Sequence, residues 1–362
     1  MIAWIILMRM ICAGSMRYTW LANGANAYTV PARLATFTMA YIVFWVGIRT
    51  GVADTGTYIR YFISTSPDLS QISIIQEAGG KGILWKISII LFKAFVSENW
   101  QVWLMTLAMI MGFSVSYCFY KHSEAFFFSM LLFILTTNFT WMLNGMRQFL
   151  CVSTLMVAFS WLVEGKTKQY MILIALLSLI HFTVWLMVPI YFVVRQKPWS
   201  RLVLLAIMGT CIICAFAAPF TGAVEEALQH TQYQGAQIVN ALDDGAHPIR
   251  VVILSVPAVI AWYNRKSIEE ENNPKLNILI NLSILSALLM LFSVFTSGIM
   301  MGRLAIYCSV YSAIALPMLI SRMPNKNQQL LLRYCCIIGY MIYFYTQIQN
   351  VNYNSYITGY IL

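Results

Sequence analysis

The feature that most constrains this chain is a succession of long apolar segments separated by short polar loops. Segments of about 15–22 apolar residues are long enough to cross, or nearly cross, a bilayer as helices. Only 10% of the residues are charged, against roughly 25% in a soluble domain. Lipid offers the backbone no hydrogen-bond partners, and the apolar residues run continuously, which favours helices over a β-barrel. We therefore predict an all-α fold, a polytopic integral membrane helical bundle with about 11–12 spans.

Domain organisation follows from the absence of breaks in this pattern. No linker rich in Pro, Gly or Ser and no insertion of soluble-domain length interrupts the sequence. Residues 1–362 are therefore predicted to form a single integral membrane domain. A long connection over residues 49–100 and the longest polar loop, residues 219–248, are both predicted to lie on the outer side.

Two apolar segments differ from ordinary spans. Residues 82–97 carry Lys86 and Lys93, which lie seven apart and so share one helical face. This pattern predicts a helix that lies in the membrane interface. Basic residues flank residues 170–194 on both sides, which predicts a hairpin of two short helices that enters and leaves on one side, with His181 near the bend. A single tilted span is the alternative.

The net charge of +10 comes mostly from basic loops. In a soluble chain this excess would suggest nucleic acid, but here it indicates cytoplasmic loops that set topology and contact membrane lipids, so no nucleic-acid partner is expected. With the basic loops inside, five polar residues from separate segments fall on the outer side: Arg49, Asp54, Asn144, Arg147 and Arg303. We predict that they form one outward-facing site.

Arginines dominate this predicted site. Arg147 lies between two apolar runs, residues 125–141 and 149–163. An arginine there costs several kcal/mol unless an anion or water receives it. Together with Arg49 and Arg303 it would form a positive pocket, and guanidinium groups bind phosphate through paired hydrogen bonds. The alternative is that each arginine extends separately to lipid headgroups.

Two further ionisable residues are candidates for proton transfer. Asp54 follows Arg49 in a glycine-rich turn and could serve as a general base, orient a sugar hydroxyl, or simply pair with an arginine. His181 is the only histidine inside an apolar run, and could be either a catalyst or a buried structural residue. The sequence has no P-loop, no Gly-rich nucleotide fingerprint and no spaced metal ligands. We therefore expect neither a metal nor another cofactor.

Several motifs, in this order, resemble the EpsG-like family, the Wzy-type polymerases of bacterial surface polysaccharides. They are Gly47-x-Arg49, Gly51-x-x-Asp54 and Tyr58, then Glu77 before a Gly-led helix, Asn144-Gly145-Met146-Arg147-Gln148, His181 before Phe-Thr, and Arg303 with Tyr307. The Asn-Gly-x-Arg-Gln element is the most specific of these. The chain departs from the family pattern at Thr57 and at Thr183-Val184.

The resemblance implies a glycosyltransferase of GT-C-like architecture at the outer face of the bacterial inner (plasma) membrane. It would move a growing glycan from undecaprenyl pyrophosphate onto a lipid-linked repeat unit, for O-antigen (lipopolysaccharide), capsule or exopolysaccharide. A chain-length regulator would be a partner. Asp54 or His181 would be the base; Arg147 and Arg303, with Arg49 next, would hold the diphosphate. Asn144, Gln148 and Tyr58 would orient sugars or Arg147 itself, and Tyr307 would also contribute to substrate binding.

Two other functions compete with this interpretation. A flippase or transporter of lipid-linked oligosaccharide would favour two pseudo-symmetric halves and a midplane site, and no such halves are apparent. An O-antigen ligase or acyltransferase would favour a long outer loop, whereas residues 219–248 are short.

Overall fold

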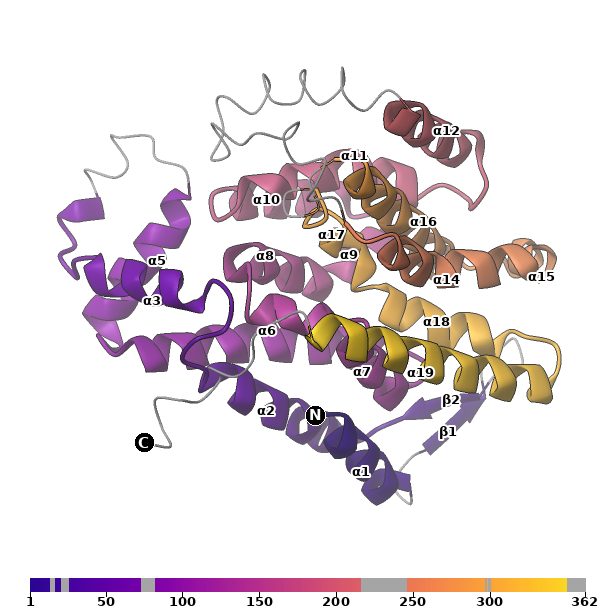
Figure 1. The fold of residues 1–362 in the computed structure, drawn as a ribbon, viewed down its shortest axis with the longest axis horizontal. Coiled ribbons are helices and arrows are strands. Elements are labelled where there is room, and N and C mark those ends of the chain that lie inside the picture. Colours follow the sequence, from indigo (N-terminus) through magenta and orange to yellow (C-terminus); the bar gives the residue numbers. More distant parts are fainter. Residues whose placement is uncertain are drawn as a thin grey trace.

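The computed structural model describes residues 1–13, 17–20, 26–72, 82–215, 246–296, 298 and 301–349. These residues form a bundle of helices with one small β-hairpin beside it (Figure 1). Strands β1 (Arg17–Trp20) and β2 (Asn26–Thr29) pair antiparallel, with Arg17 opposite Thr29. The predicted all-α architecture is therefore correct for the bundle, and the hairpin is a departure from it.

The helices follow the apolar segments closely. In chain order they are α1 (Ile2–Cys12), α2 (Ala32–Gly47), α3 (Thr55–Ser64), α5 (Ile83–Phe95), α6 (Trp100–His122), α7 (Phe126–Leu135), α8 (Met146–Val157), α9 (Phe159–Glu164), α10 (Thr167–Ser178), α11 (Met187–Val194), α12 (Arg201–Ala215), α14 (Ile249–Tyr263), α15 (Arg265–Glu271), α16 (Pro274–Val294), α17 (Ile306–Ser309), α18 (Ser312–Ser321) and α19 (Lys326–Gln349). Short 3-10 helices η2 (Asn138–Met142) and η3 (Phe182–Leu186) interrupt two of the apolar runs.

Two of the described helices, α6 and α16, are long and apolar enough to cross a bilayer. Both begin at an asparagine cap: Asn99 Oδ1 accepts from Gln101 N at 2.8 Å, and Asn273 Oδ1 accepts from Lys275 N at 3.1 Å. Such caps satisfy backbone N–H groups that the helix itself leaves open. The described residues also contain eight shorter apolar helical segments, and every residue of α7 is buried. The architecture is that of a membrane helical bundle.

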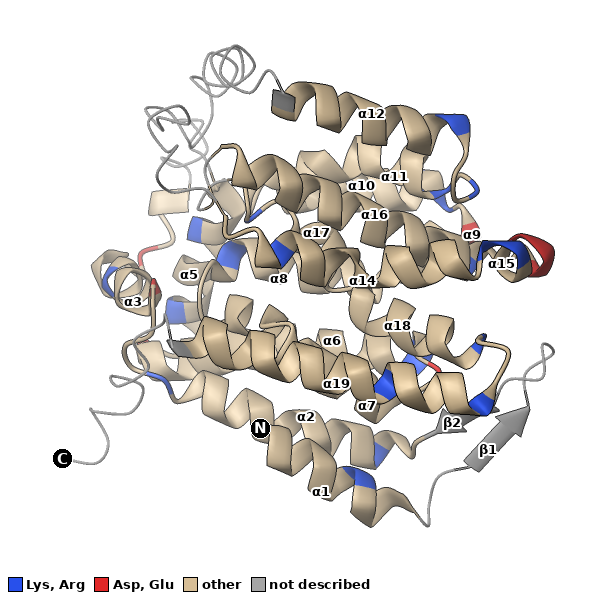
Figure 2. Cartoon of the chain, turned by 45° about the vertical axis from the view of Figure 1, so that its right-hand side comes forward, with Lys and Arg blue, Asp and Glu red and all other residues tan. Residues whose placement is uncertain are grey.

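Charged residues gather toward opposite ends of this bundle, with a largely uncharged band between them (Figure 2). One end carries α3, α5 and the start of α8; the other carries α15 and the start of α19. At the second end, Arg322 donates through Nε and Nη2 to Glu271 at 2.6 and 2.9 Å and through Nη1 to Glu124 at 3.0 Å. This buried cluster joins α15, the end of α18 and the start of α7.

Replacing Arg322 by Met is expected to lower the free energy of unfolding by about 3–5 kcal/mol, because it removes the ion-pair partner of the buried Glu124 carboxylate. Thermal unfolding of the protein in lipid nanodiscs measures the loss. The control is Glu164→Gln, which removes an ion pair with Lys166 whose side chains are both about half exposed, and it should leave the unfolding temperature unchanged. Equal unfolding temperatures for Arg322→Met and the native protein would contradict the prediction.

The segment at 82–97 is a helix as predicted, but one of its lysines lies elsewhere than expected. Lys93 is buried: its Nζ donates to Phe62 O at 3.2 Å and to Thr65 O, and lies 5.2 Å from the centre of the Phe62 ring. It therefore binds the carbonyl end of α3 instead of facing headgroups. The prediction that Lys86 and Lys93 both face lipid headgroups is therefore wrong for Lys93. Its ammonium group binds backbone carbonyl groups of a second helix instead.

The predicted hairpin at 170–194 is present. Helix α10 ends at Ser178, the chain turns, and η3 and α11 return, with His181 in the turn. Thr167 at the start of α10 and Tyr191 in α11 share a hydrogen bond of 2.6 Å between their hydroxyls, as an antiparallel pair requires. The start of α5 docks on this turn through Leu84 N, which donates to Leu179 O at 3.1 Å. The turn thus lies at the same end of the bundle as α3 and α5.

Candidate functional site

Asp54 lies just outside α2, in a turn that places it at the start of α3. The residue before it, Ala53, has a positive φ of 48°, a backbone shape that few residues adopt outside tight turns. Asp54 Oδ2 lies 3.7 Å from Arg303 Nη2, and the two side chains are 43% and 33% exposed. The carboxylate and guanidinium therefore form an accessible ion pair between segments far apart in the sequence.

Gln148 positions the backbone of Arg303. The amide Nε2 of Gln148 donates to Arg303 O at 2.9 Å, and the Gln148 side chain is buried. This bond joins the first turn of α8 to the turn that precedes α17. Gln148 therefore fixes the backbone that carries Arg303 and does not itself reach an open surface.

Arg147 projects from the first turn of α8, directly after Gly145, whose φ of 68° starts the helix in the left-handed region. Arg147 is half-buried, yet across the described residues it forms neither a hydrogen bond nor an ion pair. Burial raises the pKa of the Tyr61 hydroxyl, and the Arg147 charge opposes that rise. A Cβ at Gly82 would lie 3.3 Å from Arg147 Nη1. Glu77, nearby in sequence, lies outside the described residues.

Two consecutive hydrogen bonds link His181 to the hydroxyl groups of Thr183 and Tyr307. Its Nδ1 lies 2.7 Å from Thr183 Oγ1, and that oxygen lies 2.8 Å from the Tyr307 hydroxyl. His181 is only 7% exposed, and the residue before it, Ile180, lies beside Arg147: a Cβ at Gly82 would lie 3.5 Å from Ile180 O and 3.3 Å from Arg147 Nη1. The turn of the helical hairpin thereby brings His181 near Arg147.

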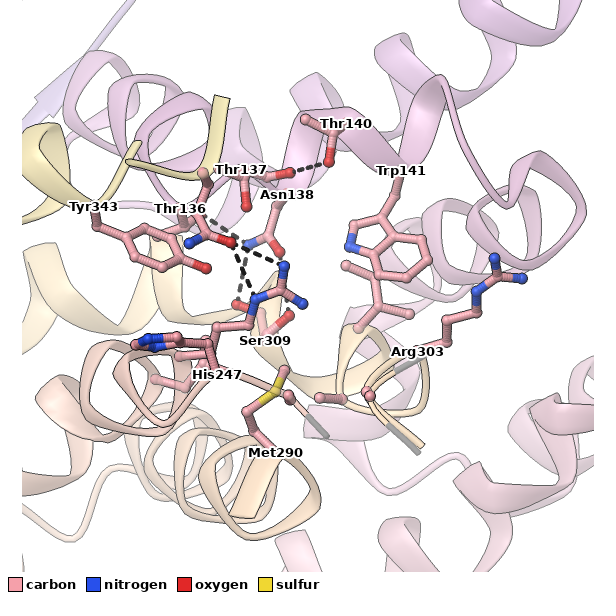
Figure 3. A pocket seen from close by; sticks show the side chains of 18 of the residues that line it. Thr136, Thr137, Asn138, Thr140, Trp141, His247, Met290, Arg303, Ser309 and Tyr343 are labelled. Atoms are coloured by element: carbon pink, nitrogen blue, oxygen red, sulfur yellow. Dashed lines mark hydrogen bonds between the residues drawn. The ribbon is translucent and has the colours of Figure 1, made fainter. Parts of the chain in front are cut away.

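Beside this cluster the structure contains a cavity of about 670 Å³. Figure 3 shows Trp141 and Arg303 on one side of it and Tyr343 and His247 on the other. Asn144 also lines the cavity, and its buried Oδ1 has no hydrogen-bond partner among the described residues. An unsatisfied amide oxygen in a cavity wall is suited to accept a hydrogen bond from a hydroxyl group. Asn144, Arg303 and Trp141 thus offer polar and aromatic groups to one bound molecule.

Of the seven predicted substrate residues, Asn144 and Arg303 line this cavity, whereas Arg147, Gln148, Arg49, Tyr58 and Tyr307 do not. The last three of these contact other parts of the protein. Arg49 is fully buried: its Nε donates to Thr55 Oγ1 at 3.0 Å, and its other nitrogens contact Val46 O and Met146 Sδ. It therefore fastens the end of α2 to α3 and α8, and does not join the positive pocket as expected. Tyr58 packs edge-on against Trp85, with ring centres 5.9 Å apart. Tyr307 is buried and reaches the cluster only through Thr183.

Sequence reasoning missed Arg250, a second arginine in the cavity wall. It lies in the first turn of α14, where the apolar pattern suggested only the start of a span. It also missed the polar run at 136–140, which lines the cavity where η2 interrupts an apolar segment. In both cases the sequence contained a feature that could have indicated these residues, namely polar residues at the edge of an apolar run. Among the described residues, no group of three or more His, Cys, Asp or Glu could hold a metal.

Comparison with known proteins gives one match. The model of the EpsG family matches residues 33–362, which include every residue of the cluster and cavity discussed above. No curated protein and no solved structure was found to match the chain. Because the family match extends over most of the sequence, in agreement with the resemblance of its motifs, the chain belongs to the EpsG family.

Proposed function

We propose that this protein is a polysaccharide polymerase of the bacterial inner membrane. It moves a growing glycan from undecaprenyl pyrophosphate onto a lipid-linked repeat unit. The observation that carries the proposal is the ion pair of Asp54 with Arg303 in a cavity wall, together with the approach of Arg147 to the turn that contains His181. Membership of the EpsG family supports a polymerase-type function for this arrangement.

The reaction exchanges one bond at the anomeric carbon for another. The acceptor hydroxyl oxygen bonds to the anomeric carbon of the growing glycan, and the bond from that carbon to the pyrophosphate oxygen breaks. The hydroxyl proton passes to a carboxylate, and undecaprenyl pyrophosphate leaves with the electron pair. The donor already carries an activated bond, so no nucleotide is consumed.

Arg147 and Arg303 are assigned to the diphosphate. Negative charge grows on the leaving group in the transition state, and preorganised cations near it lower the barrier. Among the described residues, Arg147 has no anionic partner that an incoming diphosphate would have to displace. Arg303 has Asp54 at 3.7 Å, longer than a direct hydrogen bond, and can turn to a stronger anion.

Asp54 is assigned as the general base. A base must reach the acceptor hydroxyl, and the Asp54 side chain is 43% exposed beside an arginine that lines the cavity. His181 is far less exposed, and its ring already contacts Thr183. In this assignment diphosphate binding to Arg303 releases the carboxylate for proton transfer. His181 then acts by positioning, with Thr183 and Tyr307.

The remaining predicted residues divide by location. Asn144 lines the cavity and is assigned to a sugar hydroxyl. Gln148, Tyr58 and Arg49 are positioning residues, because each contacts protein groups that hold the site. The site faces the outer side in this proposal, since the opposite end of the bundle carries the basic loops that favour the cytoplasm.

The test is elongation in vitro with purified protein in nanodiscs, given an undecaprenyl-pyrophosphate-linked repeat unit and no nucleotide. A ladder of longer lipid-linked glycans on a gel is the expected result. Transfer of the substrate across the bilayer without any ladder would favour a flippase and contradict the proposal.

A further inference from the structure

The end of the cavity away from Arg303 contains a second cation with an unusual partner. Arg250 donates through Nε and Nη2 to one oxygen, Gln347 Oε1, at 3.1 and 2.9 Å. That partner is a neutral amide, and within the described ranges no carboxylate pairs with Arg250. A guanidinium keeps its charge in any environment. An amide satisfies two of its N–H groups but does not compensate that charge.

The cavity wall that contains Arg250 also contains hydroxyl and amide groups, among apolar residues such as Leu254 and Met290. Asn138 is fixed on both sides, because its Nδ2 donates to Thr136 Oγ1 at 3.0 Å and its Oδ1 accepts from Ser309 Oγ at 3.2 Å. Other polar lining residues are Thr137, Thr140 and Thr346. Figure 3 shows the ring of Tyr343 on the same side as Thr136 and Asn138. Hydroxyl, amide and aromatic groups together are suited to the hydroxyls and C–H faces of a sugar.

We infer that this end of the cavity binds a sugar carrying a negative charge, and that Arg250 selects repeat units that carry one. The inference rests on the proposed function, since it takes the cavity to hold glycan. A carboxylate or a phosphate ester accepts hydrogen bonds from a guanidinium and neutralises it. Arg303 then serves the leaving group at one end, while Arg250 serves the sugar at the other.

The competing role for Arg250 is purely structural, a tie between α14 and α19. Gln347→Glu separates the two roles, because it places a carboxylate where Oε1 now lies, about 3 Å from the same nitrogens. The tie is kept and strengthened as an ion pair. The new carboxylate then neutralises the charge of Arg250, so Arg250 no longer attracts an anionic sugar.

The experiment measures binding of three ligands that differ only at carbon 6: glucose, glucuronic acid and glucose 6-phosphate. Saturation-transfer NMR on the full-length protein, in nanodiscs of zwitterionic lipid, avoids competition from anionic headgroups. We expect the native protein to bind at least one of the two acids roughly tenfold more tightly than glucose, as one charge-assisted pair allows. Gln347→Glu should abolish this preference while the unfolding temperature stays the same or rises.

Two further variants serve as controls for the ligand preference. Arg250→Gln removes the cation without adding a carboxylate and should also abolish the preference. Arg265→Gln removes the arginine that lies over Trp262 at the other end of α14, and should retain it. Equal binding of all three ligands by the native protein, or a preference that survives Gln347→Glu or Arg250→Gln, would overturn the inference.

Failure of this inference is distinguishable from failure of the proposed function. The ligand preference is measured without any elongation, and elongation of a neutral repeat unit does not require Arg250. If Arg147→Ala still binds the acidic sugars more tightly than glucose but forms no ladder, the result supports both the assignment of Arg147 to the diphosphate and that of Arg250 to the sugar. A native protein that prefers the acids and forms no ladder with any repeat unit leaves the sugar subsite in place and rejects the polymerase.

Discussion

Arg147→Ala is expected to abolish chain elongation while the protein still inserts and folds. The side chain contacts no anion and donates no hydrogen bond among the described residues, so its removal breaks no internal partnership there. If it stabilises the departing diphosphate, turnover should fall by roughly 10²–10³-fold or more, the scale for loss of one preorganised electrostatic group. Gels of surface glycan from cells, and of the products of the nanodisc assay, measure the loss.

The matched control is Arg60→Ala, on the same side of the bundle. Arg60 is exposed on α3, and among the described residues its side chain donates one hydrogen bond, from Nη2 to Thr57 Oγ1 at 3.2 Å. We expect native ladders from this variant. Arg147→Lys should retain part of the activity, since lysine keeps the charge but loses the planar pair of donors. Full-length ladders from Arg147→Ala would refute the assignment of Arg147.

Much of the cluster was predictable because ionisable groups are expensive near lipid. Arg147, His181 and Arg303 interrupt or border apolar runs, and such residues face a shared interior where partners or water receive them. The structure brings Asp54 to Arg303, and the turn that contains His181 to Arg147. The hairpin at His181 was also predictable, because basic residues on both sides of one apolar segment require the chain to return.

The direction of individual side chains was not predictable. Arg49 and Arg303 both border an apolar segment, yet one is fully buried against α3 and α8 and the other lines a cavity. The position of an arginine in the sequence indicates how far along the apolar segment it lies. It does not indicate in which direction the side chain points. Lys93 illustrates the same limit, because the carbonyl groups that receive it belong to another helix. Arg250 was missed because one charge at the start of a span resembles an ordinary topology signal.

Asp54→Asn is expected to lower elongation by about 10²–10⁴-fold, the range for loss of a general base. The amide keeps the size of the side chain and can still contact Arg303, so the donor lipid should bind as before. A structural role for Asp54 would give a different result, with weaker donor binding and a lower unfolding temperature. Single-turnover elongation, together with separate measurement of donor affinity, distinguishes the two roles.

Chemical rescue gives the sharper form of this test. In Asp54→Ala a space remains where the carboxylate stood, and added formate can enter it and accept the hydroxyl proton. We expect formate to restore part of the elongation to Asp54→Ala but none to Arg303→Ala, which lacks the cation instead of the base. His181→Ala should keep more activity than Asp54→Ala and respond little to formate, because its ring acts through Thr183 and Tyr307. Rescue of His181→Ala by imidazole, with no rescue of Asp54→Ala by formate, would transfer the role of base to His181.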